Sequence, residues 1–134
     1  MAIAYSKIIV EVREISLKNR PEELYNISLK GTVPVLYEQD GVVIDESLEI
    51  MIWALSIFDS DLWFKKEKKI QLELINENDN EFKNWLDKYK YFDRYPEKNQ
   101  KYYRTKCNKF LNKLNSRLEN HDFIISNNIS MVDI

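Results

Sequence analysis

Apolar residues in the first third of the chain fall into short runs of the kind that form strands. Residues 8–15 are rich in β-branched side chains and partly alternate with polar ones, which favours a strand. Two further apolar runs, 33–37 and 42–44, are separated by a segment that ends in Asp40-Gly41. Because Asp-Gly is a strong hairpin signal, we expect these two runs to pair as antiparallel strands.

Two helices are predicted among these strands. Pro21 followed by two glutamates suits a helix start, and this helix should end before Gly31. Residues 48–58 are apolar on nearly every side, so they predict a helix that is covered on more than one face.

The second half of the chain shows helical periodicity without any strand-like stretch. Its first apolar stripe has the i, i+3, i+4, i+7 spacing of one helical face, and consists of Phe82, Trp85, Leu86 and Tyr89. A longer stripe of the same kind consists of Tyr103, Cys107, Phe110, Leu111, Leu114 and Leu118. Two antiparallel helices are therefore expected, with Tyr95-Pro96 between them. Ser130 and Asp133 have the spacing of a capping box, which predicts another helix start.

Composition narrows the class of protein. The net charge of the 134 residues is -2, which gives no general attraction to nucleic acid. A single cysteine excludes an internal disulfide, and a single histidine offers no second imidazole for a metal site. No run of about 18 apolar residues is present. We therefore expect a cytoplasmic protein with no metal, nucleic-acid or membrane partner.

The residues from Val33 to Ser47 combine features of a ligand site. Pro34 removes a hydrogen-bond donor from an apolar strand pattern, so nearby backbone groups are left for another partner. Glu46 and Ser47 stand just before a helix, where free N–H groups and the helix dipole favour an anion. The plainer alternative is that Glu46 and Ser47 only cap the helix.

This layout resembles the thioredoxin-like half of a glutathione transferase, in which a Val-Pro pair is followed by Glu-Ser, here Val33-Pro34 and Glu46-Ser47. Residues 78–91 and 130–134 are similar to the helical half of bacterial members. The resemblance implies an incomplete α/β thioredoxin-like lobe followed by an all-α helical lobe. It also implies two domains, a glutathione-binding domain at 1–60 and an incomplete helical domain at 65–134.

The resemblance also implies roles for particular residues. The backbone of Val33, across a cis bond to Pro34, would pair with the cysteinyl part of glutathione. Glu46 and Ser47 would hold the ammonium and carboxylate of the γ-glutamyl group, and Lys30 would reach the glycine carboxylate. Glutathione would be a co-substrate.

The catalytic residue is expected to lie outside this sequence. In the family, a first strand, a loop and most of a first helix precede the position of Met1, and that loop carries the catalytic serine, cysteine or tyrosine. We therefore expect a chain truncated at both ends. Tyr5 and Ser6 are the nearest hydroxyl groups, but the expected helix would hold them beyond reach of the thiol. Cys107 lies on an apolar stripe and is interpreted as a core residue.

Three functions follow from the resemblance. The first is a homodimeric transferase that conjugates glutathione to small electrophiles. The second is a glutathione-transferase-like interaction module without catalysis. The third is a glutathione-dependent thiol oxidoreductase, which would need a cysteine in the segment expected upstream of Met1.

Overall fold

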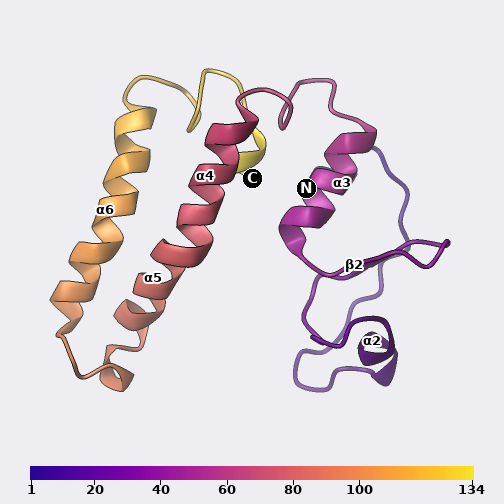
Figure 1. The fold of residues 1–134 in the computed structure, drawn as a ribbon, viewed down its shortest axis with the longest axis horizontal. Coiled ribbons are helices and arrows are strands. Elements are labelled where there is room, and N and C mark those ends of the chain that lie inside the picture. Colours follow the sequence, from indigo (N-terminus) through magenta and orange to yellow (C-terminus); the bar gives the residue numbers. More distant parts are fainter. The chain divides into compact units, whose positions relative to one another are not determined.

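A computed structural model describes residues 1–134, which divide into two compact units, Met1–Asp61 and Leu62–Ile134 (Figure 1). We refer to them as unit 1 and unit 2. The elements of unit 1 are α1 Ala2–Tyr5, α2 Glu22–Ile27, β1 Leu36–Tyr37, β2 Val43–Ile44 and α3 Ser47–Ile57. The elements of unit 2 are α4 Lys68–Glu77, η1 Asn78–Phe82, α5 Lys83–Lys90, η2 Phe92–Arg94, α6 Gln100–Leu118 and η3 Met131–Asp133.

The predicted hairpin is confirmed. Strands β1 and β2 are antiparallel, with Leu36 opposite Ile44 and Tyr37 opposite Val43. The connecting turn is closed by a hydrogen bond from the Glu38 amide to the Val42 carbonyl, at 2.8 Å. Gly41 has a φ of 92°, in the left-handed region that glycine adopts most readily. The Asp-Gly signal therefore marked the turn correctly.

The strand predicted at 8–15 is wrong. The chain there forms no ladder, and the side chains of Ile9 and Val12 are 98% and 75% exposed. The sheet has two strands, β1 and β2, and an isolated bridge joins Ser16 to Asn19. β-Branched residues favour an extended backbone, but a strand also requires a hydrogen-bonded neighbour, which this segment does not have in the sheet.

Helix α3 supplies most of the core of unit 1. Ile50, Ala54 and Leu55 are buried, and α1 packs against this helix. Ser6 is the residue after α1, and its hydroxyl donates to the carbonyl of Phe58, the residue after α3, at 2.9 Å. This hydrogen bond joins the carboxyl ends of the two helices. The apolar pattern therefore predicted the helix and its part in the core, whereas Ile57, at its carboxyl end, is 58% exposed.

Unit 2 is built from helices, as the sequence predicts. Helix α4 continues through the π-helical turn η1 into α5, and α6 packs alongside α5 (Figure 1). The ring centroids of Phe82 and Phe110 are 5.1 Å apart, and those of Trp85 and Tyr103 are 6.5 Å apart. These members of the two predicted stripes thus face each other, whereas Leu111 and Leu118 of the longer stripe are exposed.

Gln71 connects α4 to the end of the chain. Its side chain is fully buried, and Nε2 donates to the carbonyls of Trp63 and Lys66 at 2.8 and 2.7 Å. Its Oε1 accepts from the Val132 amide at 3.2 Å. The predicted capping box is confirmed at the start of η3, where both reciprocal hydrogen bonds of Ser130 and Asp133 are present.

None of the helices combines the length and apolar character that a membrane span requires.

Candidate functional site

The candidate site lies where β2 leads into α3. Glu46 is the N-cap residue of α3, with an extended backbone, and its carbonyl accepts from the Ile50 amide at 3.0 Å. The Glu46 side chain makes no capping hydrogen bond, and Glu46 and Ser47 are both exposed. Because the first amides of a helix have no acceptor within the helix, the start of α3 offers N–H donors together with the Ser47 hydroxyl.

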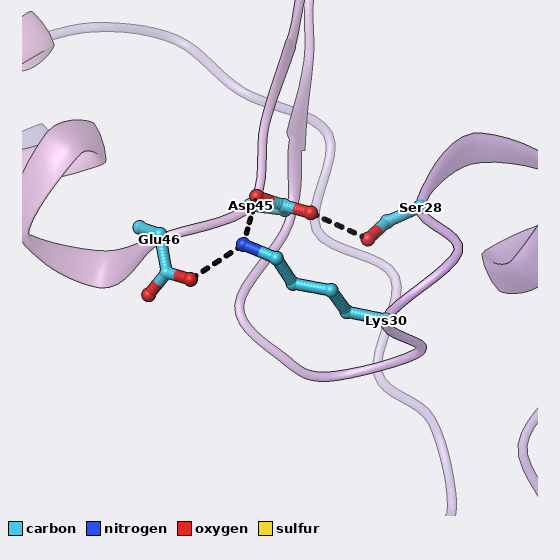
Figure 2. Close-up of polar contacts among 4 residues, drawn as sticks. All are labelled: Ser28, Lys30, Asp45 and Glu46. Carbon is cyan, nitrogen blue, oxygen red and sulfur yellow. Dashed lines mark hydrogen bonds and ion pairs between the residues drawn. The ribbon is translucent and has the colours of Figure 1, made fainter.

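Two carboxylates beside this helix start hold one lysine ammonium. Lys30 Nζ donates to Asp45 Oδ1 at 3.0 Å and to Glu46 Oε1 at 2.6 Å (Figure 2). On the far side of Asp45, Oδ2 accepts from Ser28 Oγ at 2.8 Å. We call Asp45 and Glu46 the acidic pair. Ser28 is buried, so the acidic pair is attached at one end to a fixed part of unit 1.

A tight turn brings Lys30 to the acidic pair. The Ser28 amide donates to the Leu24 carbonyl, which ends α2, and the Gly31 amide donates to the Ser28 carbonyl. Gly31 has a φ of 58°, and a Cβ at that position would lie 2.3 Å from Cε1 of Tyr25. Glycine is therefore required for the backbone to pass Tyr25 and leave Lys30 beside Asp45.

These contacts change the protonation equilibria of two groups. Hydrogen bonds from Ser28 and then Lys30 lower the pKa of Asp45, because they stabilise its carboxylate. Hydrogen bonds to Glu46 and then Asp45 raise the pKa of Lys30 above its ordinary value. Both Asp45 and Lys30 are consequently charged at neutral pH.

The Val33–Pro34 segment lies at the same end of the hairpin as Glu46. The bond between Val33 and Pro34 is cis, as the sequence analysis expects, and both residues are exposed. Pro34 comes two residues before β1 and Glu46 two residues after β2, so both follow the end of the hairpin away from its turn.

The structure brings together some of the residues predicted from the sequence and adds others. Lys30 and Glu46 are in direct contact, and Ser47 is the next residue along the chain. Sequence reasoning missed Asp45, although the Asp-Glu doublet before a helix was a visible signal. It also missed Ser28, which lies 17 residues from Asp45 in sequence and carries no local signal.

The hydroxyl groups near the amino terminus are already engaged. Tyr5 OH accepts from the Asp61 amide at 2.9 Å and lies 3.3 Å from Ser60 Oγ. Ser6 is buried and bonded to the Phe58 carbonyl. These contacts give both side chains structural roles.

Cys107 is a core residue, as predicted. It is buried in α6, and desolvation raises the pKa of its thiol. A protonated thiol is a weak nucleophile, so the geometry does not suit Cys107 for redox chemistry.

Comparison with known proteins agrees with this description. The family model for the glutathione S-transferase N-terminal domain matches residues 1–56. A solved structure of a class Gtt2 glutathione S-transferase of Vibrio parahaemolyticus superposes with a TM-score of 0.62 and 24% sequence identity. The alignment covers 92% of this chain and 61% of that one, so the chain spans less than two thirds of the length of its structural neighbour. No curated protein matched.

The fold is therefore glutathione-transferase-like, with a thioredoxin-like lobe followed by a helical lobe. Residues 1–56 match the family model for the N-terminal domain of glutathione S-transferases, and the structural match shows that the chain shares their fold.

Proposed function

We propose that unit 1 binds glutathione and that the protein conjugates it to small electrophiles. In this proposal Glu46 binds the γ-glutamyl ammonium and Ser47 binds the γ-glutamyl carboxylate. The backbone of Val33, before Pro34, pairs with the cysteinyl part, and Lys30 binds the glycine carboxylate.

The observation that carries the proposal is that a group that binds a cation lies beside a group that favours an anion. The acidic pair already holds an ammonium group, that of Lys30, at 2.6 and 3.0 Å. One residue further on, the hydroxyl of Ser47 and the first amides of α3 favour a carboxylate. An α-amino acid head group carries both charges on neighbouring atoms, so it matches this arrangement.

The proposed reaction is nucleophilic substitution by the glutathione sulfur. The thiol loses its proton to solvent, the thiolate attacks an electrophilic carbon, and the leaving group departs with the electron pair of the broken bond. Thiolate is the reactive form, so its stabilisation governs the rate. The residues named above bind and orient glutathione and do not take up the thiol proton.

Calorimetric titration with reduced glutathione tests the binding step. Glu46→Gln keeps the shape of the side chain but removes the charge, and we expect it to weaken binding about tenfold or more, as loss of a charged hydrogen bond does. Glu49→Gln, in the first turn of the same helix, is the matched control. Binding that Glu46→Gln leaves unchanged would remove the proposed site.

A glutathione-binding module without catalysis is a second candidate. It is favoured by the engagement of Tyr5 and Ser6 and by the burial of Cys107, since none of these offers a free group to activate a thiol. Turnover of a generic aryl halide in the presence of glutathione separates the two functions. Product formation above the uncatalysed rate supports the transferase, and binding without turnover supports the module.

The third function considered, a thiol oxidoreductase, has no support from Cys107. We also propose a cytoplasmic homodimer, on the strength of the family match alone. Light scattering of the purified chain tests the dimer, which requires twice the mass of a single chain.

A further inference from the structure

We propose that Lys30 competes with the ligand for the acidic pair, so that glutathione binds by exchanging one ammonium group for another. The inference rests on the proposed function, which assigns Glu46 to the γ-glutamyl ammonium. It adds that Lys30 occupies the acidic pair before the ligand binds. It also adds that Lys30 favours ligands with a carboxylate to which it can bind once it has left Glu46.

The contacts of Lys30 carry the first step. Its Nζ lies 2.6 Å from Glu46 Oε1 and 3.0 Å from Asp45 Oδ1, both hydrogen-bonding distances for an ammonium group (Figure 2). A ligand ammonium that takes the position beside Glu46 Oε1 needs the oxygen that Lys30 holds. Two like charges at that position repel each other, so a ligand ammonium that binds there displaces Lys30 from Glu46 Oε1.

The exposure of the groups makes displacement feasible. The side chains of Lys30 and Glu46 are 51% and 58% exposed, whereas that of Asp45 is 25% exposed and is bonded to buried Ser28. Lys30 can therefore leave Glu46 for water or for a new partner by changing rotamers. Asp45 stays in place and keeps Lys30 near the site.

The exchange has a consequence for specificity. Glutathione carries an ammonium that replaces Lys30 at Glu46 and a glycine carboxylate that receives Lys30. A ligand with the ammonium but without that carboxylate breaks the Lys30–Glu46 ion pair and provides no new ion pair for Lys30. Lys30 thus disfavours ligands that carry the ammonium alone.

Two ligands and one substitution distinguish displacement of Lys30 from Glu46 from a simple attraction between Lys30 and the glycine carboxylate. Glutathione is compared with its glycinamide analogue, which has a neutral amide in place of the glycine carboxylate, by calorimetric titration of the whole chain. Lys30→Met keeps the apolar stem and removes the charge. Lys18→Met, an exposed lysine of the same unit, is the control for the change in net charge.

Exchange predicts that Lys30→Met binds the glycinamide analogue about two- to fivefold more tightly than the original chain does, a range set by the strength of exposed ion pairs. The preference for glutathione over the analogue should fall by about fivefold. Lys18→Met should change neither quantity.

The remaining outcomes contradict the exchange in different ways. If Lys30→Met leaves the affinity for the analogue unchanged or weakens it, Lys30 does not compete for Glu46, while the proposed glutathione site stands. If neither ligand binds the original chain or the variant at millimolar concentration, the proposed function itself fails.

Discussion

At the residue scale, Asp45 is the group that connects the buried part of unit 1 to its exposed charges. Ser28 binds one carboxylate oxygen and Lys30 the other, at 2.8 and 3.0 Å. Exposed ion pairs contribute little to stability, because water and salt screen them. The hydrogen bond to buried Ser28 is the contact that fixes the position of the carboxylate, and through it the position of Lys30.

The lowered pKa of Asp45 predicts how its contribution depends on pH. A carboxyl group whose pKa is lower in the folded state stabilises that state above its unfolded pKa, about 3.9, and loses the effect as pH falls through the folded value. Asp45→Asn should therefore lower Tm at neutral pH, and this deficit should shrink below about pH 4. Thermal melts at both pH values measure it. Asp87→Asn, an exposed carboxylate on α5, is the control, and a deficit for Asp45→Asn that is equal at the two pH values would contradict the assignment.

Gly31 is the second residue whose replacement should have a definite effect. Alanine there combines a positive φ with a Cβ 2.3 Å from Tyr25 Cε1, so Gly31→Ala should destabilise the protein by about 1–3 kcal/mol. Gly41 also has a positive φ, but a Cβ there meets no atom within 4 Å. Urea denaturation of Gly31→Ala and Gly41→Ala measures both losses of stability, and their difference is the part due to the contact with Tyr25. An equal loss of stability in Gly31→Ala and Gly41→Ala would show that Tyr25 yields without cost.

At the element scale, local pattern predicted what local structure determines. The hairpin, the helix at Ser47–Ile57 and the capping box at Ser130 all depend on residues close in sequence, and all are confirmed. The strand at 8–15 depends on a distant partner and was wrong. The π-helical turn η1 carried no signal, because the apolar spacing of Phe82 and Trp85 is satisfied by an α-helix as well.

The same distinction applies to the candidate site. The Glu46–Ser47 pair could be recognised from its position before a helix, whereas the contacts of Ser28 and Lys30 with Asp45 span 17 and 15 residues. Contacts of that kind depend on how the Ser28–Gly31 turn and β2 are placed in space. The charge pattern and the apolar periodicity of the sequence do not predict how close the turn and the strand lie.

Gln71 is the residue that holds two elements of unit 2 together. Its side chain joins α4 to Val132 in η3 and also bonds the carbonyls of Trp63 and Lys66. Gln71→Ala would remove the side-chain partner of the Val132 amide and of the Lys66 carbonyl, so we expect a loss of about 1–3 kcal/mol in the free energy of unfolding. Urea denaturation measures this loss. Gln100→Ala, an exposed glutamine with one long hydrogen bond at 3.4 Å, is the control and should change little.

If Gln71→Ala costs no more than Gln100→Ala, then α4 and η3 are held together by apolar packing alone. Met131 in η3, which is buried, would then supply that packing.

At the scale of the whole molecule, function is assigned to the unit whose sequence carries the family match. Unit 1 contains residues 1–56, which match the N-terminal domain of glutathione S-transferases, and it contains every proposed glutathione ligand. Unit 2 contributes a helical fold in which aromatic rings of η1 and α5 pair with rings of α6.

The most direct test of the central claim is a titration of the isotopically labelled chain with reduced glutathione, followed by amide chemical shifts in NMR spectra. We expect saturable shifts at the residues of the site in unit 1, namely Lys30, Val33, Glu46 and Ser47. Saturable shifts confined to other residues, or none at millimolar glutathione, would contradict this claim.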